Sequence, residues 1–230
     1  GTPKSGKEEY WDDSDGIIWI TPEDLKDRGN TIGDSRRKLS VPGLNNSSAN
    51  LINRNSIVLS TRAPIGKVKI CTVDYTTNQG CKNLEPIKPL DIRFFYYVIL
   101  SSEKYIQSLG QGTTFTELSN YSLRNLVVPF PNMEVQKQIA DFLDQKTFEI
   151  DDFIADKEHL IELLEEKRQA VITEAVTKGL DSGVKMKDSE IDWIDAIPKH
   201  WESKPLYSVI KESKMKNKGN MIKNVLSLSY

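Results

Sequence analysis

Few residues in this chain have the type and spacing that catalysis needs. Gly110-Gln-Gly112 lacks the third glycine of a dinucleotide or methyl-donor loop, and the sequence has no Walker loop or Asn-Pro-Pro-aromatic tetrapeptide. Cys71 and Cys81 have no adjacent histidine, which leaves too few ligands for a zinc site. The nuclease-like Glu165-Glu-Lys167 lies in a helical stretch, where an ordinary charge pattern explains it better. The sequence therefore predicts a non-catalytic protein without a metal or cofactor of its own.

Basic and hydroxyl side chains point instead to a binding function. Arg36-Arg-Lys38 is a basic run in an expected loop or hairpin, and the segment Gly110 to Thr116 is small and rich in hydroxyls. Loops that present Arg, Thr and Gln can contact phosphates and base edges. The alternative for each of these residues is that it lies on the surface and contributes only to solubility. The candidate DNA-contacting residues are Arg36, Arg37, Lys38, Arg62, Lys67, Lys82, Thr113 and Thr114.

Short apolar runs predict the strands that would position these side chains. The run at 67–71 alternates polar and apolar residues, as a half-buried strand should. Turn residues bound each run, which favours separate short strands. The predicted strands lie at 17–20, 56–60 and 67–71, with a fourth that ends at 83–87.

Two helices are expected among these strands. Thr21-Pro-Glu-Asp-Leu25 has the residues of a helix start, with Thr21 as N-cap and Asp24 in the capping-box position. Residues 91–109 have helical spacing, because their large apolar residues share one face. These are Phe94, Phe95, Val98, Ile99 and Ile106. The expected fold class is α+β: a mixed α/β domain at 1–131 followed by a long coiled-coil helix.

Residues 132–179 predict one long helix. No glycine or proline occurs between Met133 and Lys178, and Gly179 is a suitable residue to end the helix. Pro129-Phe-Pro131 prevents an earlier start. At about 1.5 Å per residue the helix would reach roughly 65–70 Å, so we interpret it as a spacer or dimerising arm.

One stripe of this helix is apolar and needs a partner. Apolar residues recur at three- and four-residue steps, interrupted by Lys157 and Lys167, in a pattern like a coiled-coil seam. An isolated helix cannot bury such a stripe. The candidate partner is a helix of another copy or subunit, and the alternative is the chain's own head or tail. The predicted dimer-interface residues are Ile150, Phe153, Leu160, Leu164 and Val171.

Residues 180–230 form a third segment with short expected elements. The stretch 181–192 predicts a loop, 193–201 a compact aromatic and aliphatic knot, and 206–211 and 224–228 two strands. The chain begins without an initiator methionine and stops within an expected strand, which favours a fragment or a processed form.

Charge is unevenly distributed along the 230 residues. The net charge is −2, but residues 132–180 carry 6 basic and 12 acidic side chains, whereas 1–131 carry 16 and 14. The helix at 132–180 is acidic, whereas the domain at 1–131, called the head below, is mildly basic. This difference is consistent with a head that binds a polyanion and a helix that does not. A solvent-exposed helix face rich in acidic residues explains the charge distribution equally well. Two cysteines favour reduced core thiols. Without a signal peptide or an apolar run of about 20 residues, we expect a cytoplasmic protein away from membranes.

Two stretches closely resemble a known family. The first comprises Ile57-Val-Leu-Ser-Thr-Arg-Ala-Pro-Ile-Gly-Lys-Val and Thr77-Asn-Gln-Gly-Cys-Lys82. The second runs from Pro129-Phe-Pro-Asn-Met-Glu to Lys178-Gly-Leu180. Together they resemble the specificity subunit of type I restriction-modification enzymes over nearly the whole chain.

The resemblance implies a non-catalytic DNA-reading subunit. Such a subunit carries two target recognition domains separated by two long antiparallel helices, and each domain reads one half of a split double-stranded DNA target. The helices fix the gap between the halves and dock the methyltransferase subunits. S-adenosylmethionine, ATP and Mg²⁺ are expected only in the partner subunits, including the restriction subunit that joins for cleavage.

This chain departs from the family pattern in number, because it holds one recognition domain and one long helix. We expect a half-length form that makes a homodimer through the helix and reads an inverted-repeat bipartite site. The tail at 180–230 resembles the start of a second recognition-domain repeat, and we expect it to pack back on the first domain at 1–131. The alternative function is a coiled-coil scaffold whose head binds protein rather than DNA.

Overall fold

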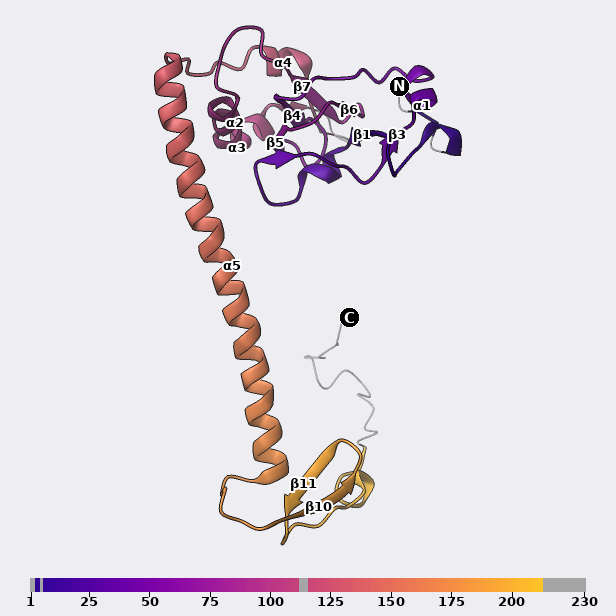
Figure 1. The fold of residues 1–230 in the computed structure, drawn as a ribbon, viewed down its shortest axis with the longest axis vertical. Helices are drawn as coiled ribbons and strands as arrows, with labels where there is room; N and C mark the ends of the chain where they lie inside the picture. The colour runs from indigo at the N-terminus through magenta and orange to yellow at the C-terminus, as the bar shows by residue number, and fades with distance from the viewer. Residues whose placement is uncertain (1–2, 5, 112–115, 213–230) are drawn as a thin grey trace, which may run out of the picture. The chain divides into compact units, whose positions relative to one another are not determined.

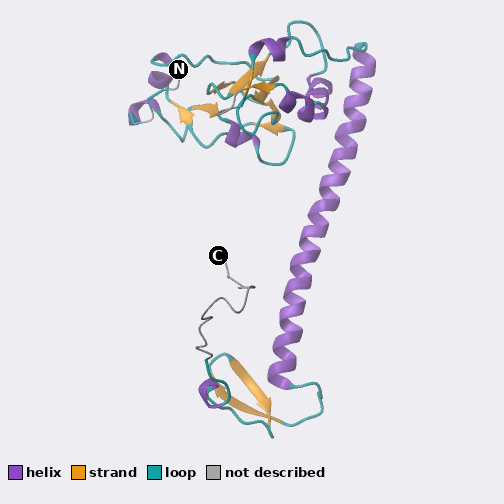
Figure 2. Cartoon of the chain, turned by 180° about the vertical axis from the view of Figure 1, so that it is seen from behind, coloured by secondary structure: helices purple, strands orange, loops and turns teal. Residues whose placement is uncertain are grey.

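The structure is a computed structural model that describes residues 3–4, 6–111 and 116–212 (Figure 1). The chain divides into two compact units, 1–152 and 153–230, and each is described by itself. The mixed strands and helices of the first unit and its long helix confirm the expected α+β class (Figure 2).

The centre of the first unit is a four-stranded sheet. Strand β4 runs antiparallel to both of its neighbours, and β2 adds parallel to β5. Because β4 is an apolar run with strands on both sides, all five of its residues are buried. In spatial order the strands are β2 (Thr31–Ile32), β5 (Val68–Cys71), β4 (Ser56–Ser60) and β7 (Cys81–Leu84).

A second sheet of three strands carries the amino-terminal part of the chain. Strand β1 lies in its middle, antiparallel to β3 and parallel to β6. Its spatial order is β3 (Lys38–Leu39), β1 (Ile17–Ile20) and β6 (Tyr75–Thr77). The register pairs Ile18 with Lys38, so the basic run of the sequence ends on the edge of this sheet.

Two apolar clusters form the core, and they correct one prediction. Strand β5 is buried on all four residues rather than half-buried, because Ile70 packs into one cluster and Cys71 into the other. The polar Lys69 is only 4% exposed, and its ammonium donates to the Arg28 carbonyl at 3.3 Å. Alternation of polar and apolar residues therefore did not indicate a solvated face here.

The helical region after the sheet is divided into two. Ser102 separates helix α2 (Ile92–Ser101) from helix α3 (Glu103–Ser108), so the predicted single helix over 91–109 was wrong in extent. The Asp91 carboxylate caps α2 by accepting from the Arg93 and Phe94 amides.

The remaining short elements connect these layers. The predicted helix start at Thr21 forms a single 3-10 turn, in which the Thr21 amide donates to Asp24 at 2.8 Å as a capping box requires. The short elements of the first unit are η1 (Glu8–Tyr10), η2 (Pro22–Leu25), α1 (Val41–Asn45), β8 (Gly110–Gln111), β9 (Glu117–Leu118) and α4 (Asn120–Arg124).

The long helix α5 spans Met133–Lys178, as predicted. Asn132 caps its start by accepting from the Val135 amide at 3.0 Å. Gly179 follows its end with a φ of +80°, which suits glycine because a side chain would be strained there. Local signals at both ends therefore fixed the helix boundaries.

The second unit contains a hairpin that the sequence did not predict. Strands β10 (Met186–Ile191) and β11 (Ile194–Pro198) pair antiparallel, where a loop and a compact knot were expected. Trp193 lies at the turn and is largely exposed. The polar strand 186–191 has no polar–apolar alternation that would reveal it, because neither of its faces packs on an apolar core; within it only Ser189 is buried.

The predicted strand at 206–211 was also wrong, because the chain forms a 3-10 turn, η3 (Leu206–Ser208). Pro205 precedes this turn and fixes the backbone angle there. The predicted strand at 224–228 lies outside the described residues.

Candidate nucleic-acid interface

The basic run Arg36-Arg-Lys38 leads into β3, and each of its side chains has an acidic or aromatic neighbour. The Arg36 guanidinium donates to the Glu23 carbonyl at 3.0 Å and lies 3.7 Å from the buried Asp24 carboxylate. Lys38 lies 3.2 Å from the carboxylate of Asp34. Arg36 and Lys38 therefore hold the loop to η2 and to its own start.

Arg37 lies on an aromatic stack. Its guanidinium carbon is 3.5 Å from the centre of the Trp11 ring, and Trp11 stacks on Trp19 with 4.7 Å between centroids. Trp19 is buried, whereas Arg37 is exposed. Cation–π contact with a fixed ring orders an arginine without neutralising it, so the guanidinium remains available to an anion. A cavity of about 310 Å³ opens beside the two tryptophans and the two arginines.

Arg62 and Lys67 lie around the turn between β4 and β5 of the four-stranded sheet. Arg62 donates to Glu117 at 3.1 Å, and Lys67 is 2.9 Å from Glu103. Both pairs are partly exposed, and exposed pairs contribute only about 0–1 kcal/mol, so a phosphate can replace the carboxylate. Arg62 also bridges to Glu117 through the backbone, which brings it to the base of the hydroxyl-rich loop.

The remaining predicted contacts have less structural context. Lys82 lies on β7, partly exposed, opposite Leu59. Thr113 and Thr114 lie outside the described residues. The structure thus brings Arg36, Arg37 and Lys38 together and separately places Arg62 and Lys67 around one turn.

The two cysteines are buried thiols, and the described residues hold no group that could bind a metal ion. Burial raises the pKa of both Cys71 and Cys81 to about 12, so their thiols stay protonated at neutral pH. Among residues 3–4, 6–111 and 116–212, no group of three or more His, Cys, Asp or Glu could hold a metal ion. Within the same residues no helix has the length and apolarity of a membrane span.

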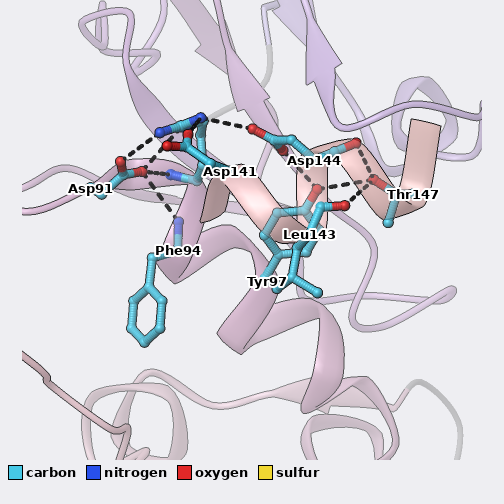
Figure 3. Close-up of polar contacts among 8 residues, drawn as sticks. Asp91, Phe94, Tyr97, Asp141, Leu143, Asp144 and Thr147 are labelled. Atoms are coloured by element: carbon cyan, nitrogen blue, oxygen red, sulfur yellow. Dashed lines mark hydrogen bonds and ion pairs between the residues drawn. The ribbon is translucent and has the colours of Figure 1, made fainter. Parts of the chain in front are cut away.

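The contacts that hold the start of α5 against α2 within the first unit were not predicted from the sequence. Arg93 of α2 donates to Asp141 at 2.7 Å and to Asp144 at 2.9 Å, both on α5, and to Asp91 at 2.9 Å (Figure 3). Gln136 is buried and accepts from the Asp91 amide at 2.9 Å. No sequence signal reveals these pairs, because the partners lie 45 to 51 positions apart.

Together these features define a class of protein: a mixed α/β binding head attached to a long helix. The family model for the type I restriction modification DNA specificity domain matches residues 2–165. The chain belongs to this family. The match includes the head and continues well into α5, so it confirms the resemblance seen in the sequence.

Curated relatives agree with this assignment. The chain is 30% identical over 217 residues to the type I restriction enzyme MjaIX specificity subunit of Methanocaldococcus jannaschii, covering 91% of this chain and 48% of that subunit. It is 26% identical over 155 residues to the EcoprrI specificity subunit of Escherichia coli, covering 63% of this chain and 38% of that subunit. The chain thus spans about half or less of the length of these relatives.

Solved structures share the fold. A chain from a study of complex assembly and conformational transition of the type I R-M system superposes with a TM-score of 0.62 at 18% identity, covering 78% of this chain and 43% of that one. The HsdS subunit from Thermoanaerobacter tengcongensis gives 0.55 at 18% identity, covering 77% and 41%.

Proposed function

We propose that this protein is a non-catalytic DNA sequence-recognition subunit that reads one half of a bipartite target and docks methyltransferase subunits. The observation that carries the proposal is the specificity-domain match over residues 2–165, which includes both the head and much of α5. S-adenosylmethionine, ATP and Mg²⁺ would act in the methyltransferase and restriction subunits of the complex. A cytoplasmic location goes with this role.

Arg37 is the residue we expect to contribute most directly to DNA contact. Its exposed guanidinium is held on Trp11 and forms no ion pair with a described acidic residue. The planar guanidinium can donate two parallel hydrogen bonds to a phosphate or to the edge of a guanine. Arg36, Lys38, Arg62 and Lys67 would add phosphate contacts by exchanging their carboxylate partners. Lys82, Thr113 and Thr114 complete the proposed set.

Two copies of the chain would pair through α5 to restore two heads. The five predicted interface residues are between 45% and 61% exposed, so this apolar face is free to meet another helix. A two-fold pair presents identical heads and favours an inverted-repeat target. We further propose that residues 180–230 pack on a recognition head; a chain lacking 190–230 whose head keeps its stability and solubility would contradict that packing.

The decisive experiment is methylome sequencing of cells that express this chain with its methyltransferase. We expect adenine methylation at a split target with a constant gap and inverted-repeat halves. If the cells show no new methylation, and if the purified complex does not bind DNA or binds it independently of salt, the alternative of a protein-binding scaffold is favoured.

A variant of Arg37 tests the proposed contact directly. Arg37→Ala should weaken DNA binding by about 5- to 10-fold and reduce the salt slope by about one, because one phosphate or base contact is lost. Lys104→Ala, which removes an exposed charge on α3, is the control. Equal affinity and equal salt slope for the two variants would reject Arg37 as a contact.

A further inference from the structure

Polar side chains, and not only apolar packing, hold α2 against the start of α5. Arg93 and Tyr97 lie one turn apart on α2, while Asp141, Asp144 and Thr147 lie one turn apart on α5. Side chains at three- and four-residue spacing share a helix face, so each helix presents one complete polar row to the other. Figure 3 shows these rows meeting directly.

The polar contacts fix the two helices in several directions at once. The planar guanidinium of Arg93 contacts three carboxylates, two of them on α5, and its geometry allows little rotation. The Tyr97 hydroxyl donates to Asp144 at 2.7 Å and lies 3.2 Å from the Thr147 hydroxyl. Hydrogen bonds to the carboxylates of Asp91, Asp141 and Asp144 raise the pKa of the Arg93 guanidinium above its ordinary value, so this side chain stays charged.

The contact region between α2 and the start of α5, called the joint below, also includes a buried side-chain amide. Gln136 accepts from the Asp91 amide at 2.9 Å and donates to the Pro131 carbonyl at 2.8 Å, so it connects the cap of α2 with the segment that leads into α5. The nearby Ala140 is fully buried and allows close approach of the helix. Asp91 therefore belongs to both halves of the joint.

We propose that this joint, with Arg93 and Gln136 as positioning residues, sets the angle between the head and α5 and thereby the DNA gap that the paired chain accepts. The inference rests on the proposed function. At about 1.5 Å per residue, α5 beyond Thr147 is roughly 45 Å long, so a tilt of about 5° moves its far end by roughly 4 Å. Successive nucleotides of a strand rise about 3.4 Å, so such a tilt shifts the accepted gap by one base pair.

The test measures methylation of a DNA series whose gap differs by single base pairs, with the complete complex. The wild-type complex should prefer one gap by about 10-fold or more over its neighbours, and Arg93→Ala should reduce that preference to about 3-fold or less, because a loosened joint tolerates more geometries. Lys146→Ala removes a positive charge from the exposed pair with Glu149 on the same helix and should keep the wild-type preference.

The outcomes separate the joint from the proposed function. If the wild-type complex methylates no member of the series, the proposed function fails. If wild type prefers one gap and Arg93→Ala lowers methylation equally at every gap, the residue serves stability alone and the inference is overturned. If Arg93→Ala does not fold, Tyr97→Phe decides, because it keeps the ring and removes only the hydroxyl contacts.

A distance measurement on the free chain gives an independent readout. Spin labels on Lys104→Cys and Glu165→Cys, both exposed positions, report the angle between head and helix. The native cysteines are buried and should not react. The distance distribution should be narrow in the otherwise wild-type chain and at least about twofold broader with Arg93→Ala, since several geometric constraints are lost. An unchanged width would contradict the joint.

Discussion

The first turns of α5 and its middle carry similar amphipathic patterns but have different surroundings. Gln136 and Ala140 are 1% and 0% exposed, because α2 and the preceding segment cover them. Leu160 and Leu164 lie in an equally regular pattern and remain about half exposed. The comparison teaches that a helical stripe fixes which residues share a face, whereas covering that face depends on what lies beside it.

The largest expected effect would come from charging the exposed stripe. Leu160→Glu with Leu164→Glu should raise the dimer dissociation constant by more than about 100-fold, because each buried leucine contributes about 1.5–3 kcal/mol. Analytical ultracentrifugation measures the change, and Gln169→Glu on the same helix is the control. A wild-type chain that is monomeric at micromolar concentration would remove the basis for this prediction.

The buried end of the helix should respond through stability rather than association. Gln136→Ala leaves the Asp91 amide and the Pro131 carbonyl without their partner and should lower the free energy of unfolding by about 1–3 kcal/mol. Urea denaturation measures it, with the exposed Gln138→Ala as control, which should change stability by less than about 0.5 kcal/mol. Equal losses in both variants would show that the two faces of the helix do not differ.

The smallest effect concerns acid pH at the joint. Burial by itself would raise the pKa of Asp91, but hydrogen bonds from Arg93 outweigh it and hold this pKa below its ordinary value of 3.8. A lowered pKa means that the charged carboxylate stabilises the folded head above about pH 4 and that this stability is lost as pH falls further.

Asp91→Asn tests that dependence without removing the helix cap, since asparagine caps as well as aspartate. The variant should be less stable than wild type at neutral pH and should approach it as pH falls below 3.8. Thermal unfolding between pH 2 and 7 measures this. A constant difference between the two chains over that range would contradict the proposed pairing with Arg93.

Local sequence signals predicted the elements that local chemistry controls. Pro129-Phe-Pro131 and Gly179 marked the two ends of α5, and the apolar runs marked β1, β4 and β5. The break at Ser102 and the hairpin at 186–198 escaped prediction. A break between two helical turns and a polar strand pair depend on neighbouring segments, and neither leaves a strong periodic pattern.

The residue types of the candidate site were predictable from the sequence, but the contacts between them were not. The basic run was evident, but only the structure showed Arg36 beside Glu23 and Asp24 while Arg37 lies on Trp11. The aromatic stack was missed because no motif relates Trp11 to Trp19. Contacts of this kind form across strands, where sequence spacing carries no information about distance.

The sequence by itself determined the α+β class, the extent of α5, the family and the apolar stripe along that helix. The tertiary structure alone decided which turns of that stripe are covered and which side chains hold the helix. The physical reason is the difference in range. Helix periodicity and capping act over three or four residues, whereas Arg93 reaches Asp141 and Asp144 only after the fold brings distant segments together.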